Sequence, residues 1–271
     1  MFTVHRIGAL DLPELAPYRT LRRPAEHEAQ GIFVAEGDKV VHRLLASQLT
    51  VVSVLLPQHR LAEYEPGLKA RGEDLPVYAV TEKRVLEELV GFEMFQGVMA
   101  VARIPPPCGL AELLAGTKLP RLFAAADGLT SAENIGVLVR NCVAFGVQAL
   151  LVGETSASPF LRRAVRNSMG TIFQLPVIET ANLGQILNEL RRQGVRCVAA
   201  HPHTDKRLLH QTSFKTDACI VFGAEGNGIS PAVLAACDEA VAIPMPPTVD
   251  SLNVASAAAV FLYEASRQRR A

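Results

Sequence analysis

The sequence contains no tryptophan and few aromatic residues, and its cysteines follow no regular spacing. Aromatic residues account for 6% of the 271 positions, and the five cysteines are scattered without a CxxC pair. Closely spaced cysteines are typical of zinc sites, and an even set of them is typical of disulfide-stapled secreted domains. The HPH stretch at 201–203 follows a predicted strand but has no further ligands at a suitable spacing. We therefore expect no metal and a reducing compartment.

The chain also lacks net charge and long apolar runs. Its 27 basic and 27 acidic residues balance, so no overall field attracts polyanions. No apolar run approaches the roughly 18 residues of a membrane span, and the start MFTVHRIGALDLPEL has no signal-peptide core. Hydrophobic residues at 49% and charged residues at 20% are typical of an ordinary globular protein. We expect a cytoplasmic protein with no membrane partner.

Composition changes once along the chain, at the consecutive prolines Pro105 to Pro107. Proline is disfavoured in helix interiors and central strands, and a run of prolines favours an extended spacer. A chain of this length is also long enough for two domains. We expect one domain over residues 1–104, a proline-rich linker over 105–118 and a larger domain over 119–271.

Short apolar runs alternate with helical patterns on both sides of the prolines. In the first part, strands are expected at 31–37, 51–57, 75–80 and 97–104, and helices at 38–48 and 82–90. In the second part, strands are expected at 121–127, 149–153, 197–201, 218–223 and 239–245, and helices at 132–146 and 182–194. Continuous apolar runs of this length are typical of buried parallel strands. The predicted fold class is α/β: a small α/β domain, then a parallel sheet covered on both faces.

The helix expected over 132–146 has a buried stripe and polar side chains on its flanks. Residues at the spacing of one helical face form the stripe: Ile135, Leu138, Val139, Cys142 and Val143. At about 100° per residue, Arg140 and Asn134 fall outside this stripe on opposite flanks. Thr130, with Glu133 three residues later, predicts a capping box at the helix start.

Two clusters of basic residues are candidates for phosphate contacts, with a solvated helix face as the alternative for each. The clusters are Arg19, Arg22 and Arg23, and Arg162, Arg163 and Arg166.

The stretch ACIVFGAEGNGIS is a strand that runs into a glycine-rich loop with Gly223, Gly226 and Gly228. Ligands of open parallel sheets bind beyond the carboxyl ends of strands, where glycines expose bare backbone. The glycine order matches neither GxGxxG nor a P-loop, and Glu225 within the loop disfavours a phosphate ligand. Alternatively, this carboxylate bonds nearby amides and holds the loop.

A third stretch, IPMPPTVDSLNVASAAA, leads from a strand through two prolines into a helix of small residues. Ser251 is placed to cap a helix that begins at Leu252, and Asp250 is favourable just ahead of a positive helix end. The small side chains of residues 255–259 let other backbone approach closely, which predicts a helix packed on several sides.

The three stretches ENIGVLVRNCVAFG, VFGAEGNGIS and IPMPPTVDSLNVASAAA resemble, in this order, the three motifs of the SpoU (TrmH-type) family of RNA ribose 2′-O-methyltransferases, of the SPOUT class. The resemblance covers residues 119–271 and implies a parallel α/β domain whose C-terminal part forms a deep trefoil knot. Upstream, GIFVAEGDKVV and FQGVMAVARIP look like the ribosomal-protein-like substrate-binding domain that often precedes this catalytic domain.

The resemblance also implies a cofactor, S-adenosylmethionine, and assigns residues to its site. Matching positions for cofactor binding are Gly223, Ile243, Met245 and Leu252. Arg140 matches the catalytic arginine, and the other polar motif residues are Asn134, Glu225, Ser251 and Asn253. Family members are homodimers, and the N-terminal domain would bind RNA, with Arg19, Arg22 and Arg23 as candidate contacts. Asp250 directly before Ser251 departs from the usual motif.

The implied function is methyl transfer from S-adenosylmethionine to a ribose 2′-hydroxyl of structured RNA. Ribosomal RNA, 23S in particular, is favoured because the first domain resembles those of ribosomal RNA-modifying members, and transfer RNA is the alternative substrate. Two other functions stay open: a catalytically silent RNA-binding dimer, and a nucleotide-dependent enzyme that uses GAEGNG as a phosphate loop.

Overall fold

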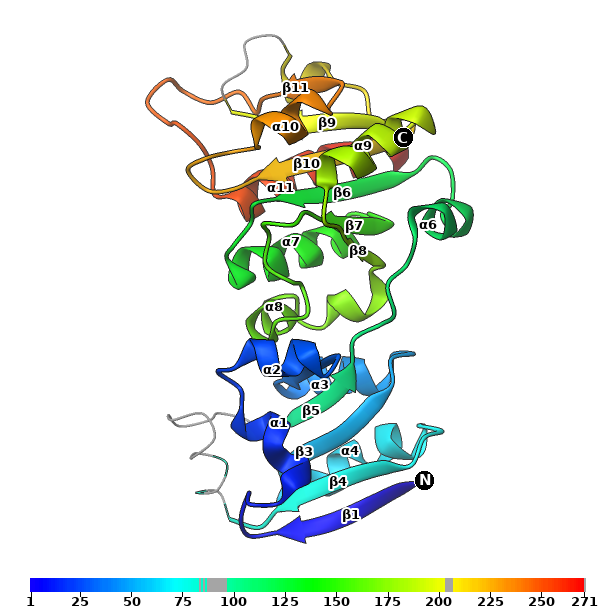
Figure 1. Ribbon diagram of the computed structural model, residues 1–271, viewed down its shortest axis with the longest axis vertical. Coiled ribbons are helices and arrows are strands. Elements are labelled where there is room, and N and C mark those ends of the chain that lie inside the picture. Colours follow the sequence, from blue (N-terminus) through cyan, green and yellow to red (C-terminus); the bar gives the residue numbers. More distant parts are fainter. Residues whose placement is uncertain (83, 85, 87–96, 203–206, 271) are drawn as a thin grey trace. The chain divides into compact units, whose positions relative to one another are not determined.

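The structure is a computed structural model that describes residues 1–82, 84, 86, 97–202 and 207–270. The chain forms two compact units (Figure 1). Unit 1 contains Met1–Pro106 and Phe160–Phe173, and unit 2 contains Pro107–Pro159 and Gln174–Ala271. None of the described helices is both long and apolar enough to cross a bilayer.

Unit 1 is a five-stranded mixed sheet in the order β1-β4-β3-β5-β2. Its strands are β1 (Phe2–Ile7), β2 (Ile32–Glu36), β3 (Val51–Pro57), β4 (Leu75–Val80) and β5 (Met99–Arg103). Its helices are η1 (Pro13–Leu15), α1 (Ala16–Arg19), α2 (Pro24–Ala29), α3 (Asp38–Leu45), η2 (Gln58–Arg60), α4 (Leu61–Lys69), α8 (Arg162–Asn167) and η3 (Thr171–Gln174), whose last residue belongs to unit 2. The four strands expected from the sequence are confirmed, and β1 is an additional one. The helix expected over 82–90 lies almost entirely outside the described residues.

A segment from the middle of the chain, residues 160–173, completes unit 1. Glu36 at the end of β2 is 6% exposed and forms ion pairs with Arg162 and Arg166 of α8. The Arg166 Nη1 atom lies 2.9 Å from Glu36 Oε1. A buried carboxylate is stable only when its charge is paired and hydrogen-bonded. Two of the three arginines in this cluster therefore neutralise Glu36, which corrects the expectation that they are available to phosphates.

Unit 2 is a six-stranded, all-parallel sheet in the order β11-β9-β10-β6-β7-β8, as Figure 1 shows. The strands are β6 (Leu122–Asp127), β7 (Ala149–Val152), β8 (Val177–Glu179), β9 (Arg196–Ala200), β10 (Ala218–Gly223) and β11 (Glu239–Val241). The helices are α6 (Leu110–Gly116), α7 (Ala132–Ala144), α9 (Leu183–Arg192), η4 (Leu209–Gln211), α10 (Pro231–Ala235) and α11 (Val254–Arg270). The expected parallel α/β sheet is confirmed, with β8 as an additional strand.

Alternate residues of the parallel strands point to opposite faces, and helices cover both. Phe123 of β6 and Val221 of β10 belong to a core that includes Leu187 of α9 and Val233 of α10. On β10, Phe222 faces the other way and packs edge-on against Phe261 of α11, with ring centroids 6.1 Å apart. Burial on both faces explains why these strands have continuous apolar sequences.

The segment 105–118 differs from the expected linker. It contains α6, and Leu110 and Leu113 of this helix are buried in the core of unit 2. Proline at 105–107 prevents a helix there but allows one to begin at Leu110, where the apolar side chains follow helical spacing.

Helix α11 begins at Val254, two residues later than predicted, because Asn253 is its cap. The Asn253 Oδ1 atom accepts a hydrogen bond from the Ala255 amide at 2.9 Å. Ser251 is exposed and does not cap the helix, so that prediction is wrong. The buried Ala255 and Ala258 allow α11 to lie close to α7, where Asn141 Nδ2 donates to the Ala255 carbonyl at 2.8 Å.

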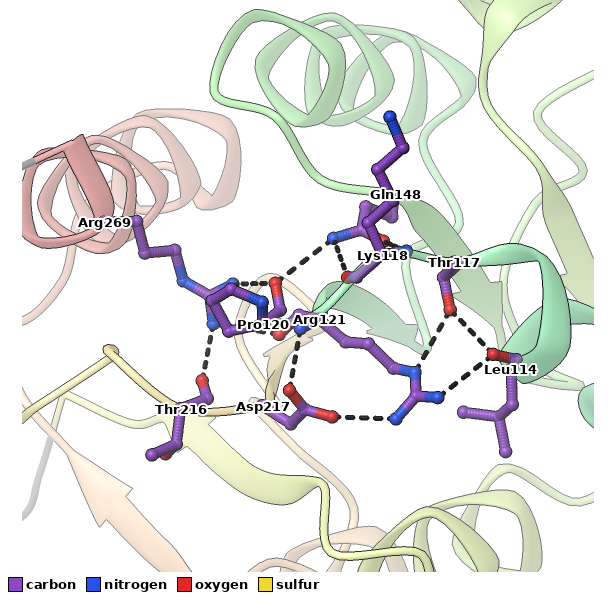
Figure 2. A network of polar contacts seen from close by, with 9 residues as sticks. All are labelled: Leu114, Thr117, Lys118, Pro120, Arg121, Gln148, Thr216, Asp217 and Arg269. Carbon is purple, nitrogen blue, oxygen red and sulfur yellow. Dashed lines mark hydrogen bonds and ion pairs between the residues drawn. The ribbon is translucent and has the colours of Figure 1, made fainter.

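The other end of α11 is fixed by Arg269, which we call the C-terminal anchor. The Arg269 guanidinium donates to the carbonyls of Pro120 at 2.7 Å, Arg121 at 2.9 Å and Thr216 at 2.6 Å (Figure 2). The anchor therefore joins the last turn of the chain to the segments that enter β6 and β10.

Replacing Arg269 with alanine removes these bonds, of which the one to the Arg121 carbonyl is part-buried. We expect Arg269→Ala to lower the free energy of unfolding by about 2–3 kcal/mol, because hydrogen bonds from a charged donor are stronger than neutral ones. The neighbouring Arg270 is exposed, so Arg270→Ala is the matched control and should change the stability by less than about 0.5 kcal/mol. Urea unfolding followed by circular dichroism measures both, and equal effects of the two substitutions would contradict the anchor.

Candidate functional site

A cavity of about 530 Å³ opens in unit 2 at the carboxyl ends of β9, β10 and β11. This is the edge of a parallel sheet at which ligands bind. Four parts of the chain form its walls. These are the end of β9, the end of β10 with the glycine loop, residues 241–254, and the first turns of α11. The lining residues include Ala200, His201, Pro202, Phe222, Gly223, Glu225, Ile243, Met245, Asp250, Ser251, Leu252, Asn253, Ala257 and Phe261.

The glycine loop after β10 folds back tightly on the strand end. Ala224 and Gly228 exchange two backbone hydrogen bonds of 2.9 Å each. A Cβ atom on Gly223 would overlap the backbone of Gly228 and Ile229 and would lie 2.6 Å from the Gly228 oxygen. Gly226 and Gly228 have φ values of +85° and +67°, which residues with a side chain rarely adopt. The loop therefore requires glycine for close approach at one position and for backbone conformation at two others.

One polar side chain from each of the three sequence stretches meets beside this loop. The Glu225 Oε1 atom accepts hydrogen bonds from Asn134 Nδ2 at 2.6 Å and from Asn253 Nδ2 at 2.8 Å. Asn253 Nδ2 also lies 3.3 Å from Asn134 Oδ1. We call Asn134, Glu225 and Asn253 the polar triad. It joins α7, the glycine loop and the start of α11, which are far apart in the sequence.

The start of α7 places Asn134 for this role. Ser131 is the N-cap and accepts a hydrogen bond from the Asn134 amide at 3.2 Å. The predicted cap at Thr130 is therefore wrong by one residue, because the Ser131 hydroxyl reaches the free amide of the first turn. Both asparagines of the triad thus lie at helix starts.

The residues expected to bind a cofactor all line the cavity, and the expected catalytic residues divide into two groups. The expected residues that line it are Gly223, Ile243, Met245 and Leu252, together with Glu225, Ser251 and Asn253 of the catalytic set, whereas Asn134 does not line it. Arg140 is exposed on α7, does not line the cavity, and has no hydrogen bond or ion pair with the residues that the structure describes.

The three arginines expected to contact RNA have different surroundings in unit 1. Arg19 donates to the carbonyls of Leu10 and Leu12, and Arg23 forms a 3.0 Å ion pair with Glu26. Arg22 is exposed and has no ionic or hydrogen-bond partner in the described part of the chain. Arg22 is therefore the least constrained of the three.

The charge of the cavity lining is negative, as the acids Glu225 and Asp250 in the second and third sequence stretches indicate. Two carboxylates, Glu225 and Asp250, line the cavity, and no lysine or arginine does so among the described residues. His201 also lines it, directly after β9, whereas His203 of the same stretch lies outside the described residues. In the sequence, only the position of His201 directly after a predicted strand indicates that it lies at this edge of the sheet.

A separate acidic group in unit 1 is an ion-pair network. Potential ligand atoms of Asp38, His42 and Glu63 lie within 4.8 Å of one another. The guanidinium of Arg60 occupies the same network, with its Nη2 atom 2.5 Å from Asp38 and 2.8 Å from Glu63. Hydrogen bonding from Tyr64 and Arg60 holds the pKa of Asp38 below its usual value, despite the opposing effect of burial. The arginine already pairs with both carboxylates.

The comparison with known proteins identifies the region that contains the sheet of unit 2 and the cavity. The model of the SpoU rRNA methylase family matches residues 121–263, more than half of the chain. The chain belongs to the SpoU family. Its matched region contains the polar triad, Arg140 and all the residues that line the cavity, so the resemblance to the SpoU family is confirmed.

The two relatives of this SpoU protein described here match 95% and 70% of its length. It is 36% identical over 265 residues to a protein of Mycobacterium bovis named an uncharacterized tRNA/rRNA methyltransferase, covering 95% of this chain and 90% of the relative. It is 35% identical over 194 residues to the 23S rRNA (guanosine-2′-O-)-methyltransferase RlmB of Shewanella oneidensis, covering 70% and 78% of the two chains.

A solved structure is similar in fold over nearly the whole chain. The SpoU methyltransferase AviRb of Streptomyces viridochromogenes, in complex with the cofactor AdoMet, matches with a TM-score of 0.82 and 25% identity, covering 96% of this chain and 99% of the other. The similarity therefore includes both units.

We expect Gly223→Ala to destabilise the glycine loop, because the added methyl group overlaps the backbone of residues 228 and 229. The free energy of unfolding should fall by about 1–3 kcal/mol, as for other overpacked sites. Gly116 has no heavy atom within 4 Å of its added Cβ, so Gly116→Ala is the control. Urea unfolding measures both variants, and unchanged stability in Gly223→Ala would show that the loop can move aside.

Proposed function

We propose that this protein transfers a methyl group from S-adenosylmethionine to a ribose 2′-hydroxyl of structured RNA, with 23S ribosomal RNA as the favoured substrate. The observation that carries the proposal is the polar triad beside a glycine-walled cavity in a SpoU-family domain. The name of the RlmB relative supports ribose methylation of ribosomal RNA, and the AdoMet complex of AviRb supports the cofactor.

The cavity fits S-adenosylmethionine in shape and in charge. Gly223 exposes backbone polar groups, while Ile243 and Leu252 provide apolar walls for the faces of an adenine ring. The carboxylates of Glu225 and Asp250 favour a cationic ligand and repel phosphate groups. This charge disfavours the alternative of a nucleotide-dependent enzyme that binds phosphates in the GAEGNG loop.

Bound S-adenosylmethionine supplies an electrophilic methyl group, so the protein must hold the ribose hydroxyl in line with it and assist loss of its proton. The pKa of arginine lies above about 12, so an unassisted guanidinium is a poor base. Arg140 instead orients the RNA phosphate and stabilises the developing oxyanion, with the phosphate assisting proton transfer. The triad positions the reacting groups: Asn134 and Asn253 through hydrogen bonds, and Glu225 by holding both amides.

We infer that Arg140 acts on the cavity of a second copy of the chain in a homodimer. Arg140 is exposed and lies outside the lining of the cavity in its own chain. Helix α11, which packs on the same helix as Arg140, exposes Val260 by 40% and Tyr263 by 57%. These apolar groups suit an interface between two copies.

The C-terminal part of unit 2 is proposed to form the trefoil knot of the SPOUT class. Support comes from the small residues of α11, the close approach at Gly223, and membership of the SpoU family. Small side chains let one segment of a chain pass and pack within a loop of another.

Unit 1 is proposed as the RNA-binding domain, with Arg22 as its first candidate contact and with shape and phosphate recognition as its mode. Transfer RNA is the alternative substrate, since the M. bovis relative is named for either RNA. The five unpaired cysteines support a cytoplasmic location.

Arg140→Ala should abolish methyl transfer while leaving cofactor affinity unchanged. We expect a loss of roughly 100-fold or more, as for removal of other groups that stabilise an oxyanion. Unmodified ribosomal and transfer RNA would be incubated with methyl-labelled S-adenosylmethionine, and the ribose methylation mapped. Arg192→Ala, at an exposed arginine of α9, is the control. Near-normal activity of Arg140→Ala would remove this residue from the mechanism, and label in transfer RNA alone would select the alternative substrate.

The protein should sediment at twice the mass of one chain, and Val260→Arg should shift it to the monomer, because a buried, unpaired charge opposes association.

Subunits carrying Arg140→Ala mixed with subunits carrying Glu225→Gln should regain part of the activity that each lacks alone. Only mixed dimers contain one site with both groups intact. A monomeric wild-type protein, or mixtures without recovery, would contradict a shared site.

A further inference from the structure

Asp250 is an acidic residue of the cavity wall that has no partner among the described residues. It lines the cavity two residues after Thr248 and directly before Ser251, in the segment that leads into α11. Its carboxylate is exposed and has no hydrogen bond or ion pair with any residue in the described part of the chain. Its charge is therefore available to a ligand in the cavity.

The other titratable groups of the lining do not cancel this charge by an ion pair. Glu225 is also an acid, and both of its hydrogen bonds from the triad come from neutral amides. His201 is the one basic side chain that lines the cavity among the described residues, and lysine and arginine are absent there. The lining consequently combines apolar walls with an excess of negative charge.

Methyl transfer changes the charge of the ligand that such a cavity would hold. S-adenosylmethionine has a sulfonium, an ammonium and a carboxylate group, and so has one net positive charge. Its product S-adenosylhomocysteine has a neutral thioether in place of the sulfonium and has no net charge. A nearby carboxylate attracts the first ligand more strongly than the second, since Coulomb attraction acts on the charge that is lost.

We propose that Asp250 is a specificity residue that lets the cavity distinguish the methyl donor from the demethylated product by charge. This inference rests on the proposed function. Asp250 contributes to donor affinity before transfer and contributes little to product affinity after it. Loss of the sulfonium charge therefore favours release of the product and its replacement by a new donor molecule.

The test compares the affinities of the two ligands in matched variants by isothermal titration calorimetry. In Asp250→Asn the Kd of S-adenosylmethionine should rise by about five-fold, the size of effect expected for a part-exposed charge, and the Kd of S-adenosylhomocysteine should change by less than about two-fold. Sinefungin, in which an amine-bearing carbon replaces the sulfonium, is also cationic. Its affinity for Asp250→Asn should fall by the same factor as that of S-adenosylmethionine. Asp250→Glu should restore the wild-type ratio of affinities.

Glu112→Gln is the control, because it removes the same charge from an exposed position on α6 that does not line the cavity. Raising the salt concentration should weaken donor binding to the wild type more than to Asp250→Asn, because ions screen exposed charges. If the ratio of donor affinity to product affinity is unchanged in Asp250→Asn, whether both affinities stay the same or fall equally, the inference is overturned. The proposed function would remain intact. Failure of the wild type to bind any of the three ligands would instead overturn the proposed function, and this inference with it.

Discussion

The carboxylate of Glu225 is the contact on which the site depends. One of its oxygen atoms accepts hydrogen bonds from Asn134 and from Asn253, at 2.6 Å and 2.8 Å. These amides belong to helices that begin on either side of the glycine loop. Because Asn253 also caps α11 through its other side-chain atom, a single residue connects the loop, the helix start and the triad. Loss of this carboxylate would remove the hydrogen bonds that join the glycine loop to α7 and to the start of α11.

Acidic and basic side chains of the SpoU motifs lie at two different places on unit 2. The cavity lining contains acids and no lysine or arginine among the described residues, which suits a cationic donor. The arginine that the SpoU motif assigns to catalysis lies outside that lining, on the exposed flank of α7. Separation keeps the guanidinium from forming an ion pair with Glu225 or Asp250 in its own chain. A site completed by a second copy would bring the cation and the donor together only in the assembled protein.

The two units also depend on contacts between parts of the chain that are distant in sequence. In unit 1, Glu36 is buried at the end of β2 and is neutralised by arginines that lie more than a hundred residues later. In unit 2, Arg269 fixes the last turn of α11 to the segments that enter β6 and β10. The Arg269 guanidinium satisfies several carbonyl acceptors at once, which explains why an arginine rather than a lysine occupies this position.

The sequence by itself determined the α/β class, the buried parallel strands of unit 2 and the SpoU motifs, because strand burial and glycine spacing are local patterns. It also indicated which polar residues matter, although it placed the caps of α7 and α11 at Thr130 and Ser251 instead of Ser131 and Asn253. Tertiary structure alone decided that Asn134, Glu225 and Asn253 meet, and that residues 160–173 belong to unit 1. These outcomes rest on contacts between segments far apart in the chain, and no spacing within one segment encodes which partner a side chain will reach.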